Sequence, residues 1–468
     1  MAHVPVPGSE LTESGDALPF GDAVAAAIPR PVRDVLEALW SGGFAAYVVG
    51  GSLRDVLLER DPADWDLATN ARPDAVLRRF PGAVYENAFG TVAVRREGEL
   101  YQVTTFRSDH DYADYRRPHR IEFGDTIELD LARRDFTANA IAWGSVAGAT
   151  AGLVDPYDGR ADVGARLLRA VGDPRKRFEE DALRMVRAIR LAATLEFDIE
   201  AATLDAIREH AELVRFLSGE CVATELSKLL TAPTPSRGLR LMADTGILAR
   251  VSEELARQAG IPQNKVEGED LWDHTLRAVD AAPSGRPVVR LAALVHDIGK
   301  PATFADGHFI GHDAVGADLA GALLDRLREP RAVRERVVHL VRHHMFSYEP
   351  AWSDGAVRRF IGKIGVEAID ELFDLRRADN LGSGLGPDAG GLAELRERVA
   401  AELAGNAVLD RRNLAIDGRD LMEELGMPQG PTLGRIIDDL LERVIADPSL
   451  NDRATLLLLA RAGLGGDQ

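Results

Sequence analysis

The first strong pattern along the chain is an apolar run that ends in two glycines. Residues 45–49 are Ala, Ala, Tyr, Val and Val, which predicts a buried strand, and Gly50 and Gly51 follow at once. Residues 53–58 have the pattern of a short helix, so the glycines fall at a strand-to-helix turn. Glycine leaves room for a phosphate against backbone N–H groups. The pattern therefore predicts a phosphate-binding turn.

The hydrophobic period changes once along the chain. Residues 32–154 mix strand and helix signals, and from Leu167 onward the pattern is almost wholly helical. This predicts an α+β fold, with a small mixed sheet in the head followed by all-α parts. Breaks in the pattern suggest a polar tail at 1–28, a head at 29–154, a helical neck and body at 155–270, a second helical domain at 271–395 and a C-terminal helical segment at 396–468.

Composition narrows the class of protein. The length of 468 residues predicts about three domains, and a hydrophobic content of 46% is enough to form their cores. The formal net charge of −19 argues against a protein that coats nucleic acid by bulk electrostatics, although local arginines can still bind it. A single cysteine, Cys221, excludes an intramolecular disulfide. Without a signal peptide or an apolar membrane span, we expect a cytoplasmic protein with no membrane contact.

Two acidic residues follow the glycine turn closely. Asp64 and Asp66 are separated by one residue, and residues two apart on a strand point the same way. The two carboxylates can then share a pair of Mg²⁺ ions, as nucleotidyl transfer requires. A solvated loop is the alternative for such a motif alone, but the glycines upstream favour the metal site.

A second polar block lies at residues 131–140. Its arginines, Arg133 and Arg134, can hold a triphosphate near the metal site. Asp135 and Asn139 are four residues apart, and on a helix they would share one face, where they could fix the arginines or contact a sugar. A structural salt-bridge network is the alternative.

A third block, residues 180–190, predicts an amphipathic helix with Asp181, Arg184 and Arg187 on one face. Aspartate accepts and arginine donates hydrogen bonds, so the pair can meet the edge of a nucleobase in place of a template. By spacing alone, an ion pair on a helix is the commoner explanation. Arg190 extends the same arginine-rich stretch.

The second half of the chain carries histidines and aspartates in a separate constellation. Imidazole and carboxylate together suit one or two divalent ions, of a metal that the sequence does not identify, that activate water. A lone histidine is usually structural, but this many within about a hundred residues favour a metal site. His339 and His343 remain alternatives to His344. The predicted ligands are His274, His296, Asp297, His312, His344 and Asp379.

Five motifs occur in the order seen in class II tRNA nucleotidyltransferases, the CCA-adding enzymes. The chain resembles this family over roughly residues 32–270. The segments that carry the resemblance are Gly-Gly-Ser-Leu-Arg-Asp at 50–55, Asp-Trp-Asp at 64–66, Arg133 to Ala140, Asp-Pro-Tyr-Asp-Gly at 155–159 and Glu180 to Arg184.

The resemblance implies a polymerase-β-like head and template-free addition of C, C and A to tRNA from CTP and ATP. Asp64 and Asp66 would hold Mg²⁺ while the tRNA 3′-hydroxyl attacks the α-phosphate and pyrophosphate leaves. Asp181 and Arg184 would read the incoming base. The residues expected to bind the nucleotide are Gly50, Gly51, Arg54, Arg133, Arg134, Asp135, Asn139, Asp181, Arg184, Arg187 and Arg190.

The chain departs from the family pattern at two places. Gln102 stands where relatives often carry an acid that could serve as a third carboxylate, and residues 219–226 lack an arginine that relatives place there. The intact segment 108–118 favours full CCA addition, because relatives that add only C tend to lose it. As a sequence this segment also reads as a surface loop.

The histidine constellation resembles the HD metal-dependent phosphohydrolase superfamily, whose relatives hydrolyse phosphomonoesters or 2′,3′-cyclic phosphates at RNA ends. Residues 414–444 resemble the C-terminal segment of CCA-adding relatives, which could hold the tRNA elbow or pack on the rest of the chain. The alternatives are a poly(A) polymerase, an enzyme that adds only CC or only A, an HD phosphohydrolase with an RNA-binding head, and a non-catalytic tRNA-binding protein.

Overall fold

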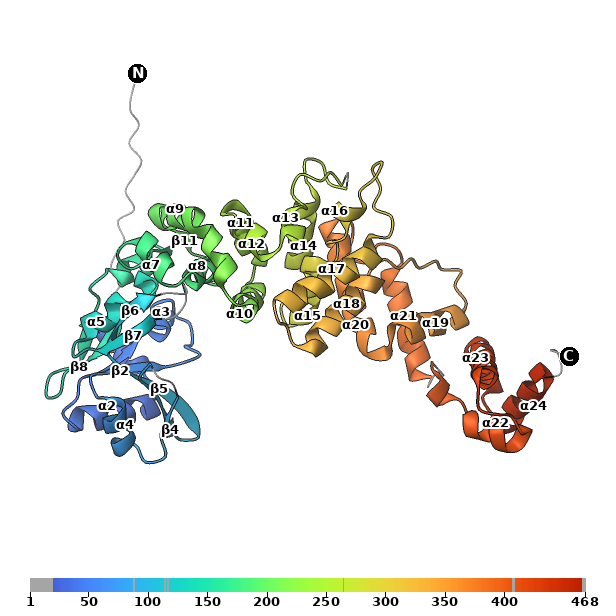
Figure 1. Ribbon diagram of the computed structural model, residues 1–468, viewed down its shortest axis with the longest axis horizontal. Helices are drawn as coiled ribbons and strands as arrows, with labels where there is room; N and C mark the ends of the chain where they lie inside the picture. Colours follow the sequence, from blue (N-terminus) through green and yellow to red (C-terminus); the bar gives the residue numbers. More distant parts are fainter. Residues whose placement is uncertain are drawn as a thin grey trace, which may run out of the picture. The chain divides into compact units, whose positions relative to one another are not determined.

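The computed structural model describes residues 20–86, 89–112, 115, 118–263, 265–405 and 409–464. It contains two compact units, and the chain passes from the first to the second between Leu217 and Ser218 (Figure 1). The finer division into five parts, with boundaries after residues 28, 154, 270 and 395, stays a prediction. Each unit is described by itself.

The first unit is built on a seven-stranded sheet. Its strand order is β3-β4-β5-β2-β1-β8-β9, and β2 runs parallel to β5 while the other neighbours are antiparallel. This mixed sheet, with helices packed on it, confirms the α+β fold of the head. The strands are β1 (Ala46–Val49), β2 (Asp66–Thr69), β3 (Val84–Tyr85), β4 (Thr91–Arg96), β5 (Glu99–Thr105), β8 (Ala142–Ser145) and β9 (Gly152–Val154).

Strand β1 lies at the centre of two hydrophobic cores. Ala46 and Val48 belong to one core, and Tyr47 and Val49 belong to a second core on the opposite face. Because side chains alternate along a strand, both faces are apolar only if the strand is covered on both sides. The unbroken apolar run at 45–49 is explained by this burial, as predicted.

The first described residues correct the prediction of a loose polar tail. Helix α1 (Phe20–Ala27) lies inside the stretch 1–28, whose residues 1–19 fall outside the described part. Val24 and Ile28 are fully buried in the core that also contains Val48. Their spacing of four residues puts both on one helix face, which the short alanine-rich sequence did not reveal.

Short strands interrupt the helical region of the first unit. Strands β10 (Leu167–Leu168) and β11 (Asp198–Ile199) pair in parallel, although helix alone was expected there. The helices of this unit are α2 (Arg30–Ser41), α3 (Gly51–Leu57), α4 (Pro73–Arg79), α5 (Ile127–Ala132), α6 (Gly159–Gly164), α7 (Pro174–Glu180), α8 (Leu183–Leu195) and α9 (Ala201–His210), with 3₁₀ turns η1 (Thr137–Asn139) and η2 (Ala211–Phe216).

The segment expected to be a surface loop forms most of a β-hairpin. Strands β6 (Arg107–Tyr112) and β7 (Pro118–Phe123) are antiparallel. Residues 113, 114, 116 and 117 of the predicted loop lie outside the described residues. Tyr115 accepts a hydrogen bond at its carbonyl from the Ala182 N–H (2.8 Å), so the hairpin contacts the turn before α8.

The described part of the second unit is helical. Its helices are α10 (Gly219–Leu230), α11 (Pro235–Asp244), α12 (Ile247–Val251), α13 (Glu253–Ala256), α14 (Leu271–Ala281), α15 (Pro287–Val295), α16 (Lys300–Thr303), α17 (His312–Arg326), α18 (Arg331–His343), α19 (Asp354–Ile364), α20 (Val366–Gly382), α21 (Leu392–Ala404), α22 (Gly418–Leu425), α23 (Pro431–Ala446) and α24 (Arg453–Leu464), with 3₁₀ turns η3 (Arg411–Asn413) and η4 (Pro448–Leu450).

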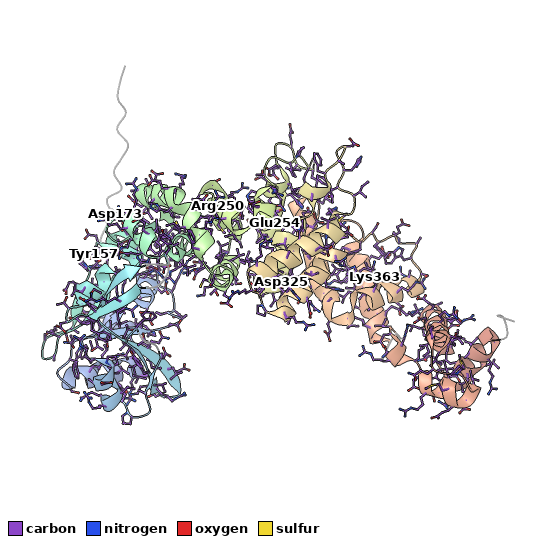
Figure 2. The ribbon with its side chains drawn as sticks, viewed as in Figure 1. Tyr157, Asp173, Arg250, Glu254, Asp325 and Lys363 are labelled. Carbon is purple, nitrogen blue, oxygen red and sulfur yellow. The ribbon has the colours of Figure 1, made fainter. Side chains whose placement is uncertain are left out.

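Local signals start several of these helices. The Asp270 side chain and its partner Asp273 form a capping box at the start of α14, and Pro287 occupies the first turn of α15. The guanidinium of Arg326 donates to both carboxylate oxygens of Glu254 (2.9 and 2.8 Å), a residue labelled in Figure 2, and ties α17 to α13. Among the described residues, no helix is both long and apolar enough to cross a membrane.

The C-terminal segment has a hydrophobic core of its own. Leu421 of α22, Leu440 and Val444 of α23, and Leu456 of α24 are buried against one another. Helix α23 packs its apolar face into this core. These side chains therefore pack within the segment itself, and this core does not test whether the segment packs on the rest of the chain or holds the tRNA elbow.

Candidate functional site

The two carboxylates of the first candidate site flank the start of strand β2. Asp66 is the first residue of β2 and pairs with Val49, whereas Asp64 lies before the strand. The prediction that both lie on one strand is wrong, because β1 ends at Val49, the partner of Asp66, and leaves no partner in β1 for the residues before Asp66. Both carboxylates are nevertheless exposed, while Trp65 between them packs on the core.

The electrostatics at Asp66 favour a cation. Crowding by neighbouring protein atoms raises the pKa of Asp66, Arg134 lowers it, and Asp64 raises it again, so that the net shift is upward. An upward shift means that the negative charge is held at a cost. A divalent cation beside Asp66 would offset this cost, and carboxylate oxygens are ligands that Mg²⁺ accepts.

The glycine turn depends on glycine at Gly50 for two reasons. Its φ of +85° is in the region that side chains rarely adopt, and a Cβ there would lie 2.8 Å from Nη1 of Arg134. Its N–H donates to the Ile141 carbonyl (3.1 Å), so this group is not the bare donor that the sequence suggested. Gly51, the first residue of α3, begins the helix end whose N–H groups lack helical acceptors.

A hydrogen-bonded chain of side chains links three elements next to this turn. Arg54 of α3 donates to Asn139 Oδ1 (2.7 Å), and Asn139 Nδ2 donates to Asp135 Oδ1 (3.2 Å). Asp135 accepts from Arg187 of α8 through Nε (3.0 Å) and Nη2 (2.6 Å). Burial alone would raise the pKa of Asp135, but Arg187 and Asn139 lower it well below its usual range.

The helix predicted for Asp135 and Asn139 does not form. Helix α5 ends at Ala132, Asp135 lies in the following turn, and Asn139 ends the 3₁₀ turn η1. The two side chains meet because Asp135 folds back on the turn, where its carboxylate also accepts the Phe136 N–H (2.8 Å). Short-range capping of this kind competes with helix formation.

Asp130, the residue that positions the arginines, is fully buried. Arg133 donates to its Oδ1 through Nε (3.0 Å) and Nη2 (2.6 Å), and Arg134 Nη2 donates to its Oδ2 (3.2 Å). Burial raises the pKa of Asp130, but the two arginines lower it more, so that the net shift is downward. The salt-bridge network that the sequence left as an alternative is therefore present at Arg133 and Arg134.

The predicted base-reading residues do not share one helix. Asp181 lies between α7 and α8 and accepts the Leu183 N–H (3.0 Å). Arg184 is buried and pairs with Glu180 (2.8 Å) and with the Arg133 carbonyl (2.9 Å). The expectation of one continuous helix is wrong because Asp181 interrupts it by binding the backbone of the next helix start.

The remaining predicted residues of this unit lie close by. Arg190 is half-buried on α8, one turn after Arg187. Gln102 is exposed on β5, and the parallel register that aligns Leu67 with Val103 sets Gln102 beside Asp66. In a parallel sheet, aligned neighbours point to the same face. A carboxylate at the position of the Gln102 amide could therefore bind the same metal ions as Asp66.

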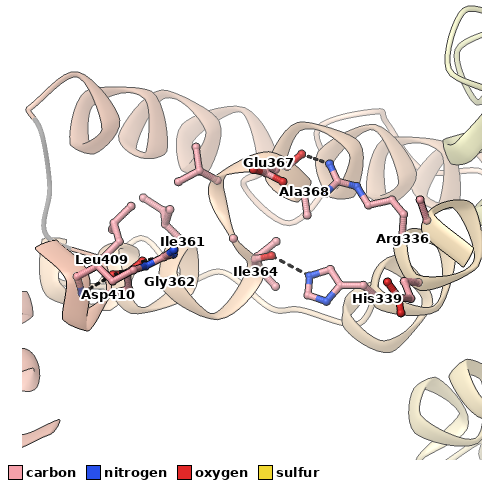
Figure 3. A pocket seen from close by; sticks show the side chains of 14 residues that line it. Arg336, His339, Ile361, Gly362, Ile364, Glu367, Ala368, Leu409 and Asp410 are labelled. Atoms are coloured by element: carbon pink, nitrogen blue, oxygen red, sulfur yellow. Dashed lines mark hydrogen bonds and ion pairs between the residues drawn. The ribbon is translucent and has the colours of Figure 1, made fainter.

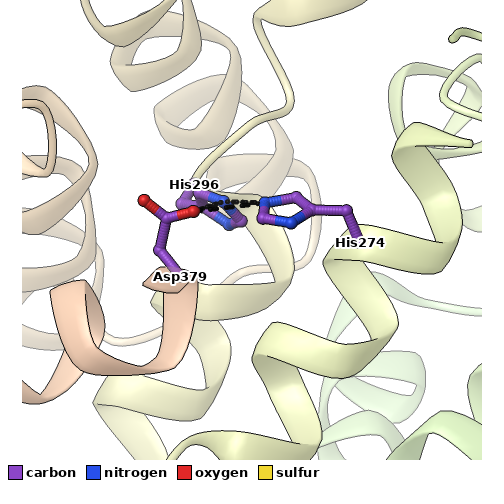
Figure 4. Close-up of side chains that lie close together, drawn as sticks. All are labelled: His274, His296 and Asp379. Atoms are coloured by element: carbon purple, nitrogen blue, oxygen red, sulfur yellow. Dashed lines mark hydrogen bonds and ion pairs between the residues drawn. The ribbon is translucent and has the colours of Figure 1, made fainter. Parts of the chain in front are cut away.

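The second candidate site gathers six side chains from the helices of the second unit. His274 is on α14, His296 caps α15, His312 begins α17, His344 caps α18 and Asp379 is on α20, with Asp297 next to His296. His274 Nε2 is 3.1 Å from His296 Nε2 and 3.3 Å from Asp379 Oδ1 (Figure 4). All six predicted ligands are brought together and buried.

Three of these imidazoles have their orientation fixed by the backbone. The Nδ1 atoms of His296, His312 and His344 contact the carbonyls of Ala293 (2.8 Å), Phe309 (2.7 Å) and Val341 (2.6 Å). A carbonyl can only accept, so each Nδ1 carries the proton and each Nε2 presents a lone pair. Nε2 of His312 and of His344 is buried without a hydrogen-bond partner among the described residues.

The ligand atoms form two groups that meet at Asp297. His274, His296 and Asp379 make one group, and Asp297, His312 and His344 make the other, with the atoms of each within 4.8 Å of one another. Asp297 Oδ1 faces His312 (3.4 Å), and Oδ2 faces His274 (3.2 Å) and His296 (3.1 Å). Burial lowers the pKa of His296 and of His312, which favours the neutral ligating form. Convergent lone pairs of this kind fit divalent ions.

A pocket of roughly 550 Å³ opens onto these ligands. Lys300 Nζ is 2.6 Å from Asp297 Oδ2, Arg376 Nη1 is 3.0 Å from Asp379 Oδ2, and Lys265 also lines the pocket. The sequence analysis missed Arg376 and Lys265. Arg376 lies three residues before Asp379 on α20, a spacing that could have signalled a pair, whereas Lys265 has no local signal.

The structure separates His344 from the two histidines that the sequence could not exclude. His339 Nε2 contacts the Ile364 carbonyl (2.8 Å), and its ring packs on His343 at 4.6 Å. His339 lines a different pocket of roughly 740 Å³, where Arg336 reaches the Glu367 carbonyl (Figure 3). Neither histidine belongs to the two ligand groups.

Family models match four segments of the chain. The poly A polymerase head domain matches residues 46–169, and the probable RNA- and SrmB-binding site of polymerase A matches residues 196–258. The HD domain matches residues 249–383, and a tRNA nucleotidyltransferase domain 2 matches residues 320–460. These matches confirm the polymerase-like head and the HD part that the sequence predicted.

Curated relatives match over nearly the whole chain. The CCA-adding enzyme of Geobacillus stearothermophilus is 32% identical over 427 residues, which are 90% of this chain and 93% of that protein. The CCA-adding enzyme of Streptococcus mutans serotype c is 31% identical over 431 residues, 91% of this chain and 95% of that protein.

Solved structures match the fold over a similar extent. The Bacillus stearothermophilus CCA-adding enzyme in complex with CTP has a TM-score of 0.71 and 28% identity, and the match covers 94% of this chain and 99% of that one. The Thermotoga maritima CCA-adding enzyme complexed with tRNA has a TM-score of 0.59 at 18% identity, covering 95% and 98% of the two chains, and shows the same fold.

Replacing Asp130 by Asn should destabilise the protein by about 3 to 5 kcal/mol, because two arginines lose a buried carboxylate. The folded-state pKa of Asp130 is lowered, so its contribution is present above the unfolded value of about 4 and is lost as the pH falls through the folded value. Denaturant unfolding between pH 3 and 7 measures both effects.

The control for this prediction is Asp125→Asn, which removes a carboxylate that pairs with Arg72 on the surface (3.3 Å). Exposed pairs contribute about 0 to 1 kcal/mol. Equal losses of stability in the two variants would contradict the role given to Asp130.

Proposed function

The chain belongs to the family of CCA-adding enzymes, and from this we propose that it adds or repairs the 3′-terminal CCA of tRNA, using CTP and ATP. The single observation that carries the proposal is the geometry of the glycine turn. Gly50 follows Val49, the strand residue that pairs with Asp66, and Arg134 approaches the same glycine. A carboxylate pair, a helix start and an arginine thus surround one place, which suits a nucleoside triphosphate.

Asp64 and Asp66 would hold Mg²⁺ at this place. The ions, when bound, assist the attack of the tRNA 3′-hydroxyl on the α-phosphate and neutralise the departing pyrophosphate. Arg133 and Arg134 are held by Asp130, which restricts their rotation and keeps their positive charges close to the place proposed for the triphosphate. The start of α3 supplies backbone N–H groups for the phosphates.

Asp181 and Arg184 would recognise the base. Arg184 is oriented by Glu180 and by the carbonyls of Arg177 and Arg133, which leaves part of its guanidinium for a base edge. Arg54, Asn139, Asp135 and Arg187 form the linked support described above, in which each side chain fixes the next. Hydrogen bonds of this kind hold the side chains that recognise the base in the precise positions that base specificity requires.

We also propose that the six buried ligands make the second site a metal-dependent phosphohydrolase that acts on RNA ends. Divalent ions, when bound, activate water for attack on phosphorus. Asp297 would bridge the two ligand groups, because its two oxygens face different imidazoles. Lys300 and Arg376 keep Asp297 and Asp379 charged and oriented through their ion pairs.

The alternatives predict different products. A poly(A) polymerase would make long A tails, and an enzyme of divided function would stop after CC or add only A. An HD phosphohydrolase with an RNA-binding head would bind tRNA and incorporate nothing. The exposed Asp64 and Asp66 and the intact arginine network argue for a working transferase.

Purified protein with Mg²⁺ and a tRNA that lacks its 3′ end should add two cytidines and then one adenosine when CTP and ATP are both present. Single-nucleotide electrophoresis resolves the products. Asp64→Ala and Asp66→Ala should each reduce addition by at least about a thousandfold, since catalysis rests on charge neutralisation.

The control for these variants is Asp61→Ala, which changes a nearby exposed acid outside the motif. A comparable loss of nucleotide addition in Asp61→Ala would mean that the removal of any nearby negative charge, and not the loss of a metal ligand, lowers activity. Unchanged addition after Asp66→Ala would contradict the proposed metal site.

Gln102→Glu should lower the Mg²⁺ concentration that gives half-maximal addition by several-fold, because it places a third carboxylate beside Asp66. A Mg²⁺ titration of initial rates measures the change, and Gln102→Ala is the control for loss of the amide. The interpretation of this position fails if the glutamate variant needs more Mg²⁺.

Metal-free protein should bind two divalent ions in the second unit and unfold at a higher temperature when they are present. Elemental analysis and thermal unfolding measure both. His344→Ala should lose about one ion and His339→Ala none, because only His344 belongs to a ligand group. Hydrolysis of an RNA 3′-phosphate should disappear with His344→Ala and survive Asp66→Ala.

A further inference from the structure

We propose that Lys265 binds the phosphate of the HD-site substrate and that Ile310, Met345 and Leu385 hold the nucleoside attached to it. The proposal rests on the hydrolytic function given to this site and identifies the residues that would select its substrate. All four residues line the pocket of roughly 550 Å³ that opens onto the metal ligands. None of them belongs to the ligand groups.

Lys265 reaches the site from outside the ligand helices. It lies in the loop before α14, and its Nζ is 2.9 Å from the Ser383 hydroxyl and 3.8 Å from Asp379 Oδ1. The ammonium group therefore stands at the edge of the ligand cluster. A phosphate oxygen placed between the ions and the pocket mouth would be within its reach.

The three cations of the pocket differ in what they are bound to. Lys300 is buried against Asp297 (2.6 Å), and Arg376 is held by Asp379 (3.0 Å). The shortest contact recorded for Lys265 is with the neutral Ser383 hydroxyl. Moving either of the first two toward a substrate would weaken the pairing of a buried carboxylate, which is costly. Lys265 is also 3.8 Å from Asp379 Oδ1, but Arg376 holds the other oxygen of that carboxylate, so Lys265 can turn to a phosphate and leave Asp379 paired.

The charge of the pocket requires an anion once ions are present. Two carboxylates, Asp297 and Asp379, face the three cations Lys265, Lys300 and Arg376, so these side chains carry a net charge of +1 before any divalent ion binds. Each ion adds two positive charges in a largely buried place. A phosphate ester supplies the missing negative charge and the oxygen donors that such ions prefer.

The mouth of the pocket is apolar. Ile310 is 87% exposed, Met345 53% and Leu385 54%, although side chains of this kind are normally covered. Their convergence on one pocket distinguishes them from scattered surface residues. A nucleobase has a flat apolar face that fits such a rim, whereas a sugar phosphate or an inorganic phosphate does not. The shared chemistry is a nucleoside phosphate, either free or at the end of an RNA.

The test is calorimetric binding to the full-length protein loaded with Mn²⁺, with metal content measured for every variant. Lys265→Ala should weaken the binding of inorganic phosphate about ten- to a hundredfold, the effect of losing one charge-assisted hydrogen bond. Lys265→Arg should restore most of it. Lys363→Ala, an exposed lysine of the same unit that does not line this pocket, should have no effect.

The rim is tested with adenosine monophosphate and ribose 5-phosphate. The double variant Met345→Ala and Leu385→Ala should weaken only the first, by about tenfold, and leave inorganic phosphate unchanged. Equal affinity of the wild-type protein for the two ligands would overturn the nucleoside assignment. An RNA oligonucleotide with a 3′-phosphate that binds more tightly than adenosine monophosphate assigns the site to RNA ends, and the reverse assigns it to free nucleotides.

The outcomes separate this proposal from the proposed hydrolysis. If phosphate binding depends on Lys265 but the protein hydrolyses no ester, the role of Lys265 is supported and the proposed hydrolysis is overturned. If the protein hydrolyses esters and Lys265→Ala, at full metal content, leaves phosphate affinity unchanged, the role of Lys265 is overturned and the proposed hydrolysis stands. Absence of metal binding by the wild-type protein overturns both.

Discussion

A carboxylate removed from water must be paired, and both candidate sites are built around that constraint. In the first unit Asp130 is buried between Arg133 and Arg134, so the same contact that stabilises the charge also aims the arginines. In the second unit Asp297 is buried among imidazoles and Lys300. Both oxygens of Asp130 are paired with arginine, whereas the imidazoles of the second site point lone pairs toward its centre. The first site therefore needs no further ion to balance its buried carboxylate, and the second can bind cations through those lone pairs.

The strand, the glycine turn and the ligand set could be predicted from the sequence because each has a local period or spacing. The apolar run before Gly50 predicted a strand covered on both faces, and the histidines and aspartates of the second half converge as expected. Two predictions that failed were the continuous helices through Asp135 and Asp181, and both failed because of capping. Asp135 and Asp181 bind nearby backbone N–H groups and end the regular helix that periodicity alone predicts.

Contacts between residues far apart in the chain could not be predicted. Lys265 reaches Ser383 across more than a hundred residues, and no pattern around either residue marks the pair. Helix α1 was not predicted for a related reason. Its two buried residues, Val24 and Ile28, stand among alanines, and only their burial in the core shows that the segment is helical and packed. Packing decides such cases, and packing is a property of the folded chain.

The inward lone pairs of the second site have a cost that the protein bears whether or not the site is used. His274 and His296 present ring nitrogens to each other at 3.1 Å, and Nε2 of His312 and of His344 lacks a hydrogen-bond partner among the described residues. Buried polar atoms without partners lower stability. A chain that gave up the chemistry of this site would therefore gain stability by replacing its histidines with apolar residues.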